Sequence, residues 1–180
     1  MNLLRTIRLD PSDTFVFPVA AEPGEWAVPG GFVFWRRNVE QLEGKERTSF
    51  RAGFLGLASL GRSTLVQVVS ATDADRAAAV EQLARQLCER FGAPDIETAR
   101  RAAGEEVAFA SSLANHPTDT LIAVRRSVED GEVREQFRTL RRREGMSIPR
   151  VFDFAEVDDD EPEERVDLAA LANSPAKGSA

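Results

Sequence analysis

The stretch TLIAVRRSVEDGEVREQFRTL, residues 120–140, carries the clearest indication of fold in this sequence. Two runs rich in branched and aromatic residues, 120–128 and 132–140, flank the pair Asp130-Gly131. Asp-Gly between two such runs is typical of a tight turn in which both central residues adopt positive φ. The stretch therefore predicts a β-hairpin and, with it, an antiparallel sheet.

The register that this turn imposes joins residues of matching chemistry across the hairpin: Val128 with Val133, Arg126 with Glu135, and Val124 with Phe137. A helix over residues 132–142 is the alternative, because Val133, Phe137 and Leu140 also recur at helical spacing. We favour the hairpin, because its turn signal and its cross-strand pairs agree with each other.

The N-terminal part of the chain also predicts strands. Turn-forming residues such as Glu22-Pro23-Gly24 and Pro29-Gly30-Gly31 separate short apolar or alternating runs. The predicted strands span residues 3–9, 14–17, 25–28, 31–35, 49–57 and 63–70. Residues 38–47 are polar and are expected to form a loop with room for one helical turn.

Residues 72–91 predict the clearest helix. Thr72 or Asp73 can cap its start, and Gly92 suits the residue just past its end. Apolar residues recur along one face at helical spacing: Val80, Leu83, Ala84, Leu87 and Phe91. This face is expected to pack against the sheet.

A second helix follows, capped by Asp95 and ended by His116-Pro117. Gly104 lies near its middle and leaves open whether it forms one helix or two. Together these elements predict a single α+β domain over residues 1–145. Its antiparallel sheet of about six to seven strands packs against two or three helices.

The net charge of −7 belongs to the C-terminal end of the chain. Residues 151–180 hold nine of the 30 acidic residues and two of the 23 Lys and Arg, so the remainder is balanced. Residues 146–180 are predicted to form an acidic, mostly disordered tail, because the run 158–164 has no apolar side chain to offset the entropy of ordering. Two apolar segments stand out in it: Val151–Phe154, which can add a strand, and Val166–Leu171, whose Leu168 and Leu171 are candidate partner contacts.

Residues that common catalytic and metal sites need are scarce. Cys88 is the single cysteine and His116 the single histidine, and no glycine-rich nucleotide loop, CxxC, HExxH or GxSxG motif occurs. The sequence therefore predicts no metal and no cofactor. The balanced body argues against nucleic acid as a partner. The lack of a signal peptide and of a long apolar run predicts a soluble cytoplasmic protein without membrane contact.

Glu106 and His116 are the candidates for acid–base chemistry. Glu106 lies near the apolar side of the second helix, where burial perturbs the pKa of a carboxyl group; a salt-bridged helix residue is the ordinary alternative. His116 lies at a helix end, where the dipole favours a cation, and an inert helix-end residue is its ordinary interpretation. Cys88 lies on an apolar helix face and is expected to be buried in the core.

Trp35 is a candidate contact for a ligand or partner. In a regular strand it has the opposite parity to Phe32 and Phe34, so it should face away from them, and Arg36 and Arg37 follow it. A basic cluster near the end of the hairpin is interpreted as a surface that attracts the acidic tail rather than nucleic acid: Arg138, Arg141, Arg142 and Arg143.

Four segments of the chain resemble a small, mainly alphaproteobacterial family of unknown function. They are residues 3–10 (LLRTIRLD), 63–69 (STLVQVV), 105–110 (EEVAFA), and His116-Pro117 with 120–124 (TLIAV). The resemblance covers residues 1–143 and implies a cytoplasmic accessory protein. It implies no catalytic residues.

These observations favour a non-catalytic accessory or interaction protein that acts on a partner protein. The alternative is a small-molecule-binding domain or enzyme with a pocket between sheet and helices, using Trp35, Arg36, Glu106 and His116. A homo-oligomer is a third hypothesis.

Overall fold

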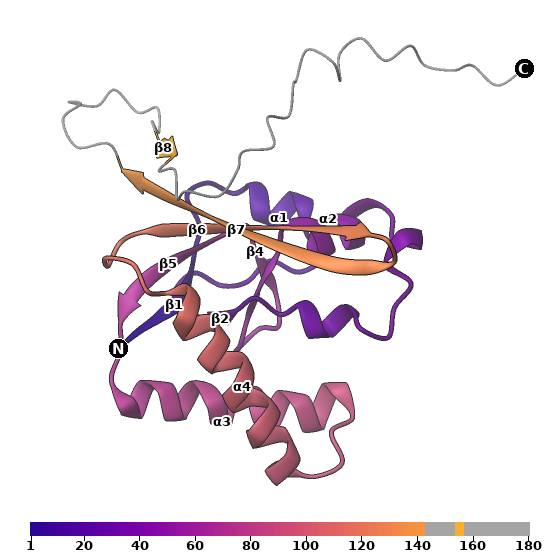
Figure 1. Ribbon diagram of the computed structural model, residues 1–180, viewed down its shortest axis with the longest axis vertical. Coiled ribbons are helices and arrows are strands. Elements are labelled where there is room, and N and C mark those ends of the chain that lie inside the picture. The colour runs from indigo at the N-terminus through magenta and orange to yellow at the C-terminus, as the bar shows by residue number, and fades with distance from the viewer. Residues whose placement is uncertain (143–153, 157–180) are drawn as a thin grey trace, which may run out of the picture.

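A computed structural model describes residues 1–142 and 154–156 (Figure 1). One antiparallel sheet runs through the molecule in the strand order β4-β3-β2-β1-β5-β6-β7-β8. Its strands are β1 (Asn2–Ile7), β2 (Trp26–Val28), β3 (Phe54–Gly56), β4 (Arg62–Ser63), β5 (Leu65–Ser70), β6 (Leu121–Glu129), β7 (Glu132–Arg142) and β8 (Phe154–Glu156). The helices are α1 (Ser12–Val16), α2 (Gly44–Ala52), α3 (Asp73–Phe91) and α4 (Ile96–Leu113), with short 3-10 helices η1 (Gly31–Phe34) and η2 (Val39–Gln41). The predicted α+β class and antiparallel sheet are confirmed.

The predicted hairpin is present with the predicted register. Val128 lies opposite Val133, Arg126 opposite Glu135, and Val124 opposite Phe137. Asp130 and Gly131 form the turn, with φ values of 53° and 79°. These three pairs and the Asp130-Gly131 turn favour the hairpin over the helical alternative for residues 132–142.

Both long helices are confirmed. Thr72 caps α3 through a reciprocal pair of hydrogen bonds with Asp75, and Gly92 ends it in the left-handed conformation. Helix α4 is continuous, so the two-piece alternative is wrong. Gly104 is part of α4, and a Cβ at this position would meet no atom within 4 Å. The buried side chains of α4 are those of Ala99, Ala103, Val107 and Ala110.

The core joins one face of the sheet to α3 and α4, which cross below the sheet in Figure 1. Register and strand alternation place on that face a set of fully or nearly fully buried aliphatic residues: Leu4, Val66, Val68, Ile122 and Val124. Arg126 and Glu135 continue the same alternation toward the hairpin turn. An ion pair therefore lies at the edge of an apolar face.

Three predicted strands in the N-terminal part were wrong wholly or in part. Residues 14–16 belong to α1, and Phe17 follows it in an extended conformation. The Asp13 carboxylate holds α1 in place by accepting hydrogen bonds from the Thr64 backbone N–H (3.1 Å) and hydroxyl (2.5 Å). Residues 31–35 form η1 and its end, because Gly30 turns the chain with a φ of 70°. In 49–57 the strand is limited to β3, and the first part completes α2, whose Phe50 packs in a second apolar cluster with Phe34 and Leu42.

The segment predicted as a tail contains a strand at residues 154–156. β8 lies within 146–180 and pairs with the end of β7 through Leu140↔Glu156, Arg141↔Ala155 and Arg142↔Phe154. The prediction that Val151–Phe154 adds a strand is met at Phe154. The rest of the predicted tail, including Leu168 and Leu171, lies outside the described residues. Among the helices of the described part, none is long and apolar enough to cross a bilayer.

Candidate functional site

Arg126 holds together the junction at which the sheet meets the loop after β2 and the end of α2. Its side chain is fully buried, and its Nε donates to Glu135 Oε1 at 2.6 Å. Its Nη1 donates to the carbonyl oxygens of Phe50 (3.0 Å) and Gly53 (2.9 Å), and its Nη2 donates to that of Pro29. The Glu135 carboxylate balances the charge of the Arg126 guanidinium, and the three carbonyl oxygens accept hydrogen bonds from its Nη atoms. This buried group therefore holds β6, β7, the end of α2 and the loop after β2 together.

Arg62 reinforces the same junction. Its Nη1 donates to the Gly53 carbonyl at 3.3 Å, so two guanidinium groups meet on one oxygen. Its guanidinium also lies over the Phe34 ring, 4.9 Å from the centroid. Burial, and then the charge of Arg126, lower the pKa of Arg62 to about 9, so the side chain remains a cation at neutral pH.

Glu106 reaches this junction from α4. Its Oε1 accepts a hydrogen bond from the Gly30 backbone N–H at 3.0 Å. Burial raises the pKa of the Glu106 carboxyl, the Gly30 hydrogen bond opposes that rise, and the nearby Glu135 carboxylate adds to it. The partly buried, perturbed carboxyl predicted at Glu106 is therefore present, and what it does in the structure is hold the turn at Gly30.

The exposed residue Trp35 stands at the end of η1 on a turn that is anchored on both sides. Its backbone N–H donates to the Phe32 carbonyl at 3.2 Å. Phe32 packs edge-to-face against both Trp35 and Phe91, with centroid distances of 6.5 Å and 5.5 Å. Phe34 points the other way and is buried against Phe50. Trp35 itself is 82% exposed.

Trp35 was expected to face away from Phe32 and Phe34, and this is wrong for Phe32, whose ring it contacts. Its exposure comes from a 3-10 turn and not from strand alternation. Of the two arginines that follow, Arg37 pairs with Glu46 at 2.6 Å and lies over the Phe34 ring, whereas Arg36 is exposed. Arg37 therefore belongs to the anchoring of the turn, and Arg36 remains open to a partner.

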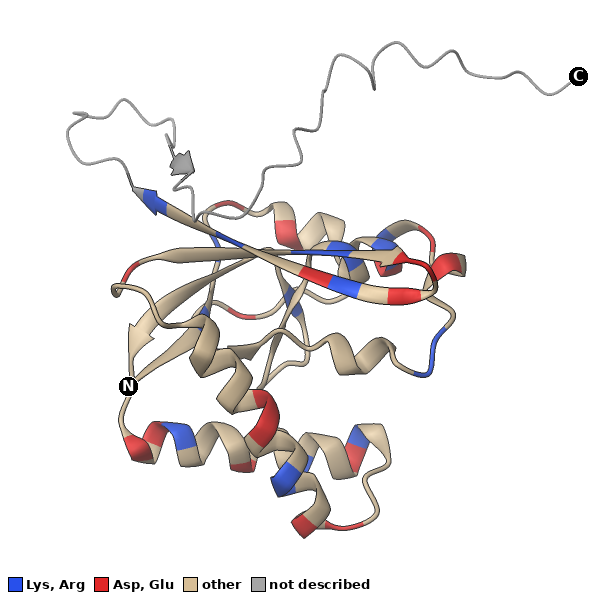
Figure 2. Cartoon of the chain, in the orientation of Figure 1, with Lys and Arg blue, Asp and Glu red and all other residues tan. Residues whose placement is uncertain are grey.

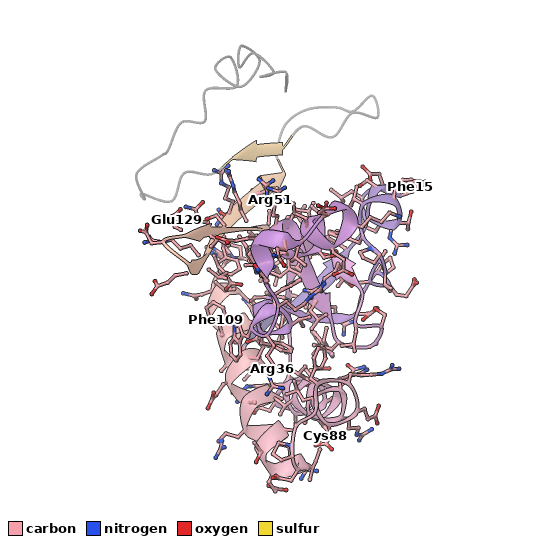
Figure 3. The ribbon with its side chains drawn as sticks, turned by 90° about the vertical axis from the view of Figure 1, so that its right-hand side faces the viewer. Phe15, Arg36, Arg51, Cys88, Phe109 and Glu129 are labelled. Carbon is pink, nitrogen blue, oxygen red and sulfur yellow. The ribbon has the colours of Figure 1, made fainter. Side chains whose placement is uncertain are left out.

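Three of the exposed large apolar residues belong to the segments that carry Gly30, Glu106 and Glu135. They are Trp35, Phe109 on α4 (40% exposed) and Val133 on β7 (46% exposed). Phe109 packs edge-to-face on Phe137 of β7 at 5.9 Å, and Figure 3 shows Phe109 on the side of the molecule formed by α4. We call these three residues with Phe32 and Phe137 the Trp35–Phe109 surface.

The other predicted site residues lie elsewhere. His116 follows the end of α4, and its backbone carbonyl accepts a hydrogen bond from Asn2 Nδ2 at 3.1 Å. Cys88 is half-buried against the core and not fully buried as predicted. Arg138 and Arg141 are exposed on β7; the side chain of Arg142 and all of Arg143 lie outside what the structure describes. The contacts of Glu106 and His116 therefore do not bring them together.

Two surface hollows border α3. One is lined by Trp26 and polar side chains of α3 that include Glu81 and Arg85, and the other by residues of α3 and by Gly104. None of Trp35, Arg36, Glu106 and His116 lines either hollow. Within the described part of the chain no three His, Cys, Asp or Glu side chains are grouped to hold a metal ion.

Sequence reasoning missed Arg62 and Arg126 as buried residues. A signal was present for Arg126, because the alternation Val124, Arg126, Val128 places it on the core-facing side of β6. For Arg62 the short strand β4 offers no such pattern.

Comparisons with known proteins place the chain in a family but give it no activity. No curated protein and no solved structure matches it. Residues 1–158 match the profile described as "Family of unknown function (DUF6505)". The match reaches beyond residue 143, where the resemblance drawn from sequence stopped, and includes β8. The chain therefore belongs to the family of unknown function DUF6505.

Proposed function

We propose that this protein is a non-catalytic accessory protein of the cytoplasm that binds a partner protein through the Trp35–Phe109 surface. The observation that carries the proposal is Trp35, 82% exposed on an anchored turn. Large apolar side chains gathered on a surface mark interaction sites, and tryptophan and arginine are enriched among the residues that dominate binding energy. Arg36, next to Trp35 in the sequence, adds an exposed arginine.

The anchoring of the turn supports binding because it lowers the cost of association. Arg126 holds the Pro29 carbonyl, Glu106 holds the Gly30 N–H, and Arg37 pairs with Glu46. A partner that covers Trp35 then meets a side chain whose backbone is already ordered, so less conformational entropy is lost on binding.

The pocket alternative has less support. The perturbed carboxyl of Glu106 accepts a backbone hydrogen bond, and the charges that affect its pKa are those of Glu135 and Arg126. The two hollows on α3 do not include it. An acid–base site needs a carboxyl aimed at a space that substrate can enter.

A photo-cross-linking amino acid at position 35 tests the proposal in cells of the source organism. We expect position 35 to give an adduct with a discrete partner protein. The same amino acid at Phe15, which is 69% exposed on α1, is the matched control and should not give that adduct. No adduct from position 35, the same adducts from both positions, or an adduct only with a second copy of this chain would contradict the proposal.

A pH-dependent stability measurement tests the assignment of Glu106 as a partly buried carboxyl. A pKa raised in the folded state favours the neutral form, so the stabilisation is complete below the ordinary pKa near 4.5 and is lost as pH rises through the folded value. Glu106→Gln keeps an oxygen for the Gly30 N–H without the charge. Its stability relative to wild type should therefore rise from pH 4 to pH 7 in denaturant titrations. Glu105→Gln, at the exposed neighbour, should give no such trend.

A further inference from the structure

Residues 15–19 form an exposed apolar surface on α1 and the turn that follows it. Phe15 is 69% exposed, Val16 38% and Val19 56%, and Pro18 is exposed as well. Within this stretch only Phe17 is buried. We call Phe15, Val16, Pro18 and Val19 the α1 apolar surface. Single exposed apolar side chains are ordinary, whereas neighbours gathered on one surface mark an interaction site.

The backbone of the α1 apolar surface is held on both sides. Before it, the Asp13 carboxylate accepts hydrogen bonds from Thr64. After it, the Val19 carbonyl accepts a hydrogen bond from the Arg62 backbone N–H at 2.8 Å, and the Ala21 N–H donates to the Arg62 carbonyl at 2.8 Å. The apolar side chains therefore stand on an ordered backbone, which lowers the entropy lost when they are covered.

Basic side chains flank the α1 apolar surface. Arg8 Nη2 donates to the Ala21 carbonyl at 2.6 Å, which places this guanidinium beside the end of the surface. Helix α2, which contacts α1, exposes three more basic side chains: Lys45, Arg47 and Arg51. The Glu46 carboxylate on the same helix is already paired with Arg37 at 2.6 Å. Figure 2 shows basic positions along α2, so the surface suits a segment that is both apolar and acidic.

The sequence of this chain contains a segment of that chemistry beyond the described residues. Residues 158–167 hold seven acidic residues and one arginine, and the stretch 166–171 brings Val166, Leu168 and Leu171. These apolar side chains match the α1 apolar surface, and the carboxylates before them match the basic side chains of α2. The arginine cluster predicted near the end of the hairpin supplies charge, whereas the α1 side supplies charge and apolar contacts together.

The chain is long enough to bring this segment to α1. Glu156 ends β8, and nine residues, 157–165, separate it from Val166. Ten extended steps span up to about 33–36 Å, whereas a domain of roughly 145 residues has a radius of gyration of about 15 Å. Figure 1 shows β8 and α1 at the end of the molecule away from α3, so the path does not cross the helical layer.

The size of the α1 apolar surface favours an occupant from the same chain. A stable interface between separate proteins buries roughly 800 Å² on each partner, more than these few side chains offer. A segment of the same chain is held near the surface by its linker, at an effective concentration that reaches about the millimolar range for short flexible linkers. Contacts too weak to join two proteins are then enough.

We infer that residues 166–171 bind the α1 apolar surface of their own chain, with the acidic run before them beside Arg8 and the basic side chains of α2. The contact is separate from the Trp35–Phe109 surface and from the partner proposed for it. It assigns α1 as the docking site of the C-terminal segment.

Photo-cross-linking within the purified full chain tests the inference. Benzoylphenylalanine takes the place of Phe15, and mass spectrometry of the irradiated monomer locates the adduct. We expect a cross-link from position 15 to residues 166–171, with a yield independent of protein concentration because both groups belong to one chain. Benzoylphenylalanine in place of Trp35, which is 82% exposed, is the matched control and should give no cross-link to 166–171.

Two pairs of substitutions separate the apolar from the charged part of the contact. Leu168→Ser with Leu171→Ser should abolish the cross-link, whereas Asn173→Ser, just beyond the segment, should leave it unchanged. Arg47→Glu with Arg51→Glu should lower the yield about tenfold, because two exposed attractions become repulsions. Replacing both arginines with lysine keeps the charge and should preserve the yield. The melting temperature shows that each variant is folded.

The same measurements can overturn the inference. No cross-link from position 15 to residues 166–171 would do so, as would the same cross-link from position 35. A yield that rises with protein concentration would assign the bound segment to a second copy instead. A cross-link that survives both pairs of substitutions would show proximity without recognition.

Discussion

Arg126→Met is expected to destabilise the protein by about 3–5 kcal/mol, the range for breaking a buried ion pair by removing one partner. The variant leaves the Glu135 carboxylate without its cation, at a position where that side chain is only 24% exposed. It also leaves the carbonyls of Phe50 and Pro29 without the donor that Arg126 supplies. Each buried acceptor left unpaired adds its own desolvation cost. Urea unfolding followed by circular dichroism measures the loss.

Arg125→Met is the matched control, because Arg125 is the exposed neighbour on the same strand. Its effect should stay within about 0.5 kcal/mol, as is usual for surface positions. A second variant, Arg126→Met with Glu135→Leu, removes both charges and should recover part of the lost stability. If Arg126→Met costs no more than the control, Arg126 does not hold the junction of β6, β7 and α2.

Elements defined by local chemistry could be predicted from the sequence. Asp130-Gly131 requires positive φ at both positions, so the hairpin register followed to the residue. Thr72 with Asp75 and then Gly92 marked both ends of α3 in the same way. In each case the residues that decide the geometry lie within a few positions of one another.

Elements defined by distant contacts could not be predicted in this way. The aromatic run at 31–35 has strand composition, yet Gly30 turns it into η1 and its side chains divide between two apolar clusters. α1 depends on a hydrogen bond from Thr64 to Asp13, 51 residues apart in sequence. Propensity is overridden where such contacts determine the backbone.

In the candidate site, too, local features could be predicted from the sequence and distant contacts could not. Glu106 could be named because its position on the apolar side of a helix is a local property. Its partner, the Gly30 N–H, is 76 residues away, and the sequence gives no indication of it. Trp35 was expected to face away from Phe32 on a strand that does not form; it lies instead at the end of η1 and contacts the Phe32 ring.

Trp35→Ala is expected to weaken binding of the partner cross-linked at position 35 by roughly 30-fold or more, which corresponds to about 2 kcal/mol for a residue that dominates an interface. Folding stability should change by less than about 0.5 kcal/mol, because the side chain is 82% exposed and buries little area in the free protein. Titration calorimetry with the purified partner gives the affinity, and urea unfolding gives the stability.

Phe15→Ala separates a specific contact from general surface apolarity. Phe15 is 69% exposed on α1, so both substitutions remove an exposed aromatic ring. Only the loss at Trp35 should affect affinity, and Phe109→Ala, on the same surface as Trp35, should give an intermediate loss. Equal losses at Trp35 and Phe15 would mean that binding follows total exposed apolar area. A loss of stability in Trp35→Ala equal to its loss of affinity would mean that Trp35 supports the fold and does not contact the partner.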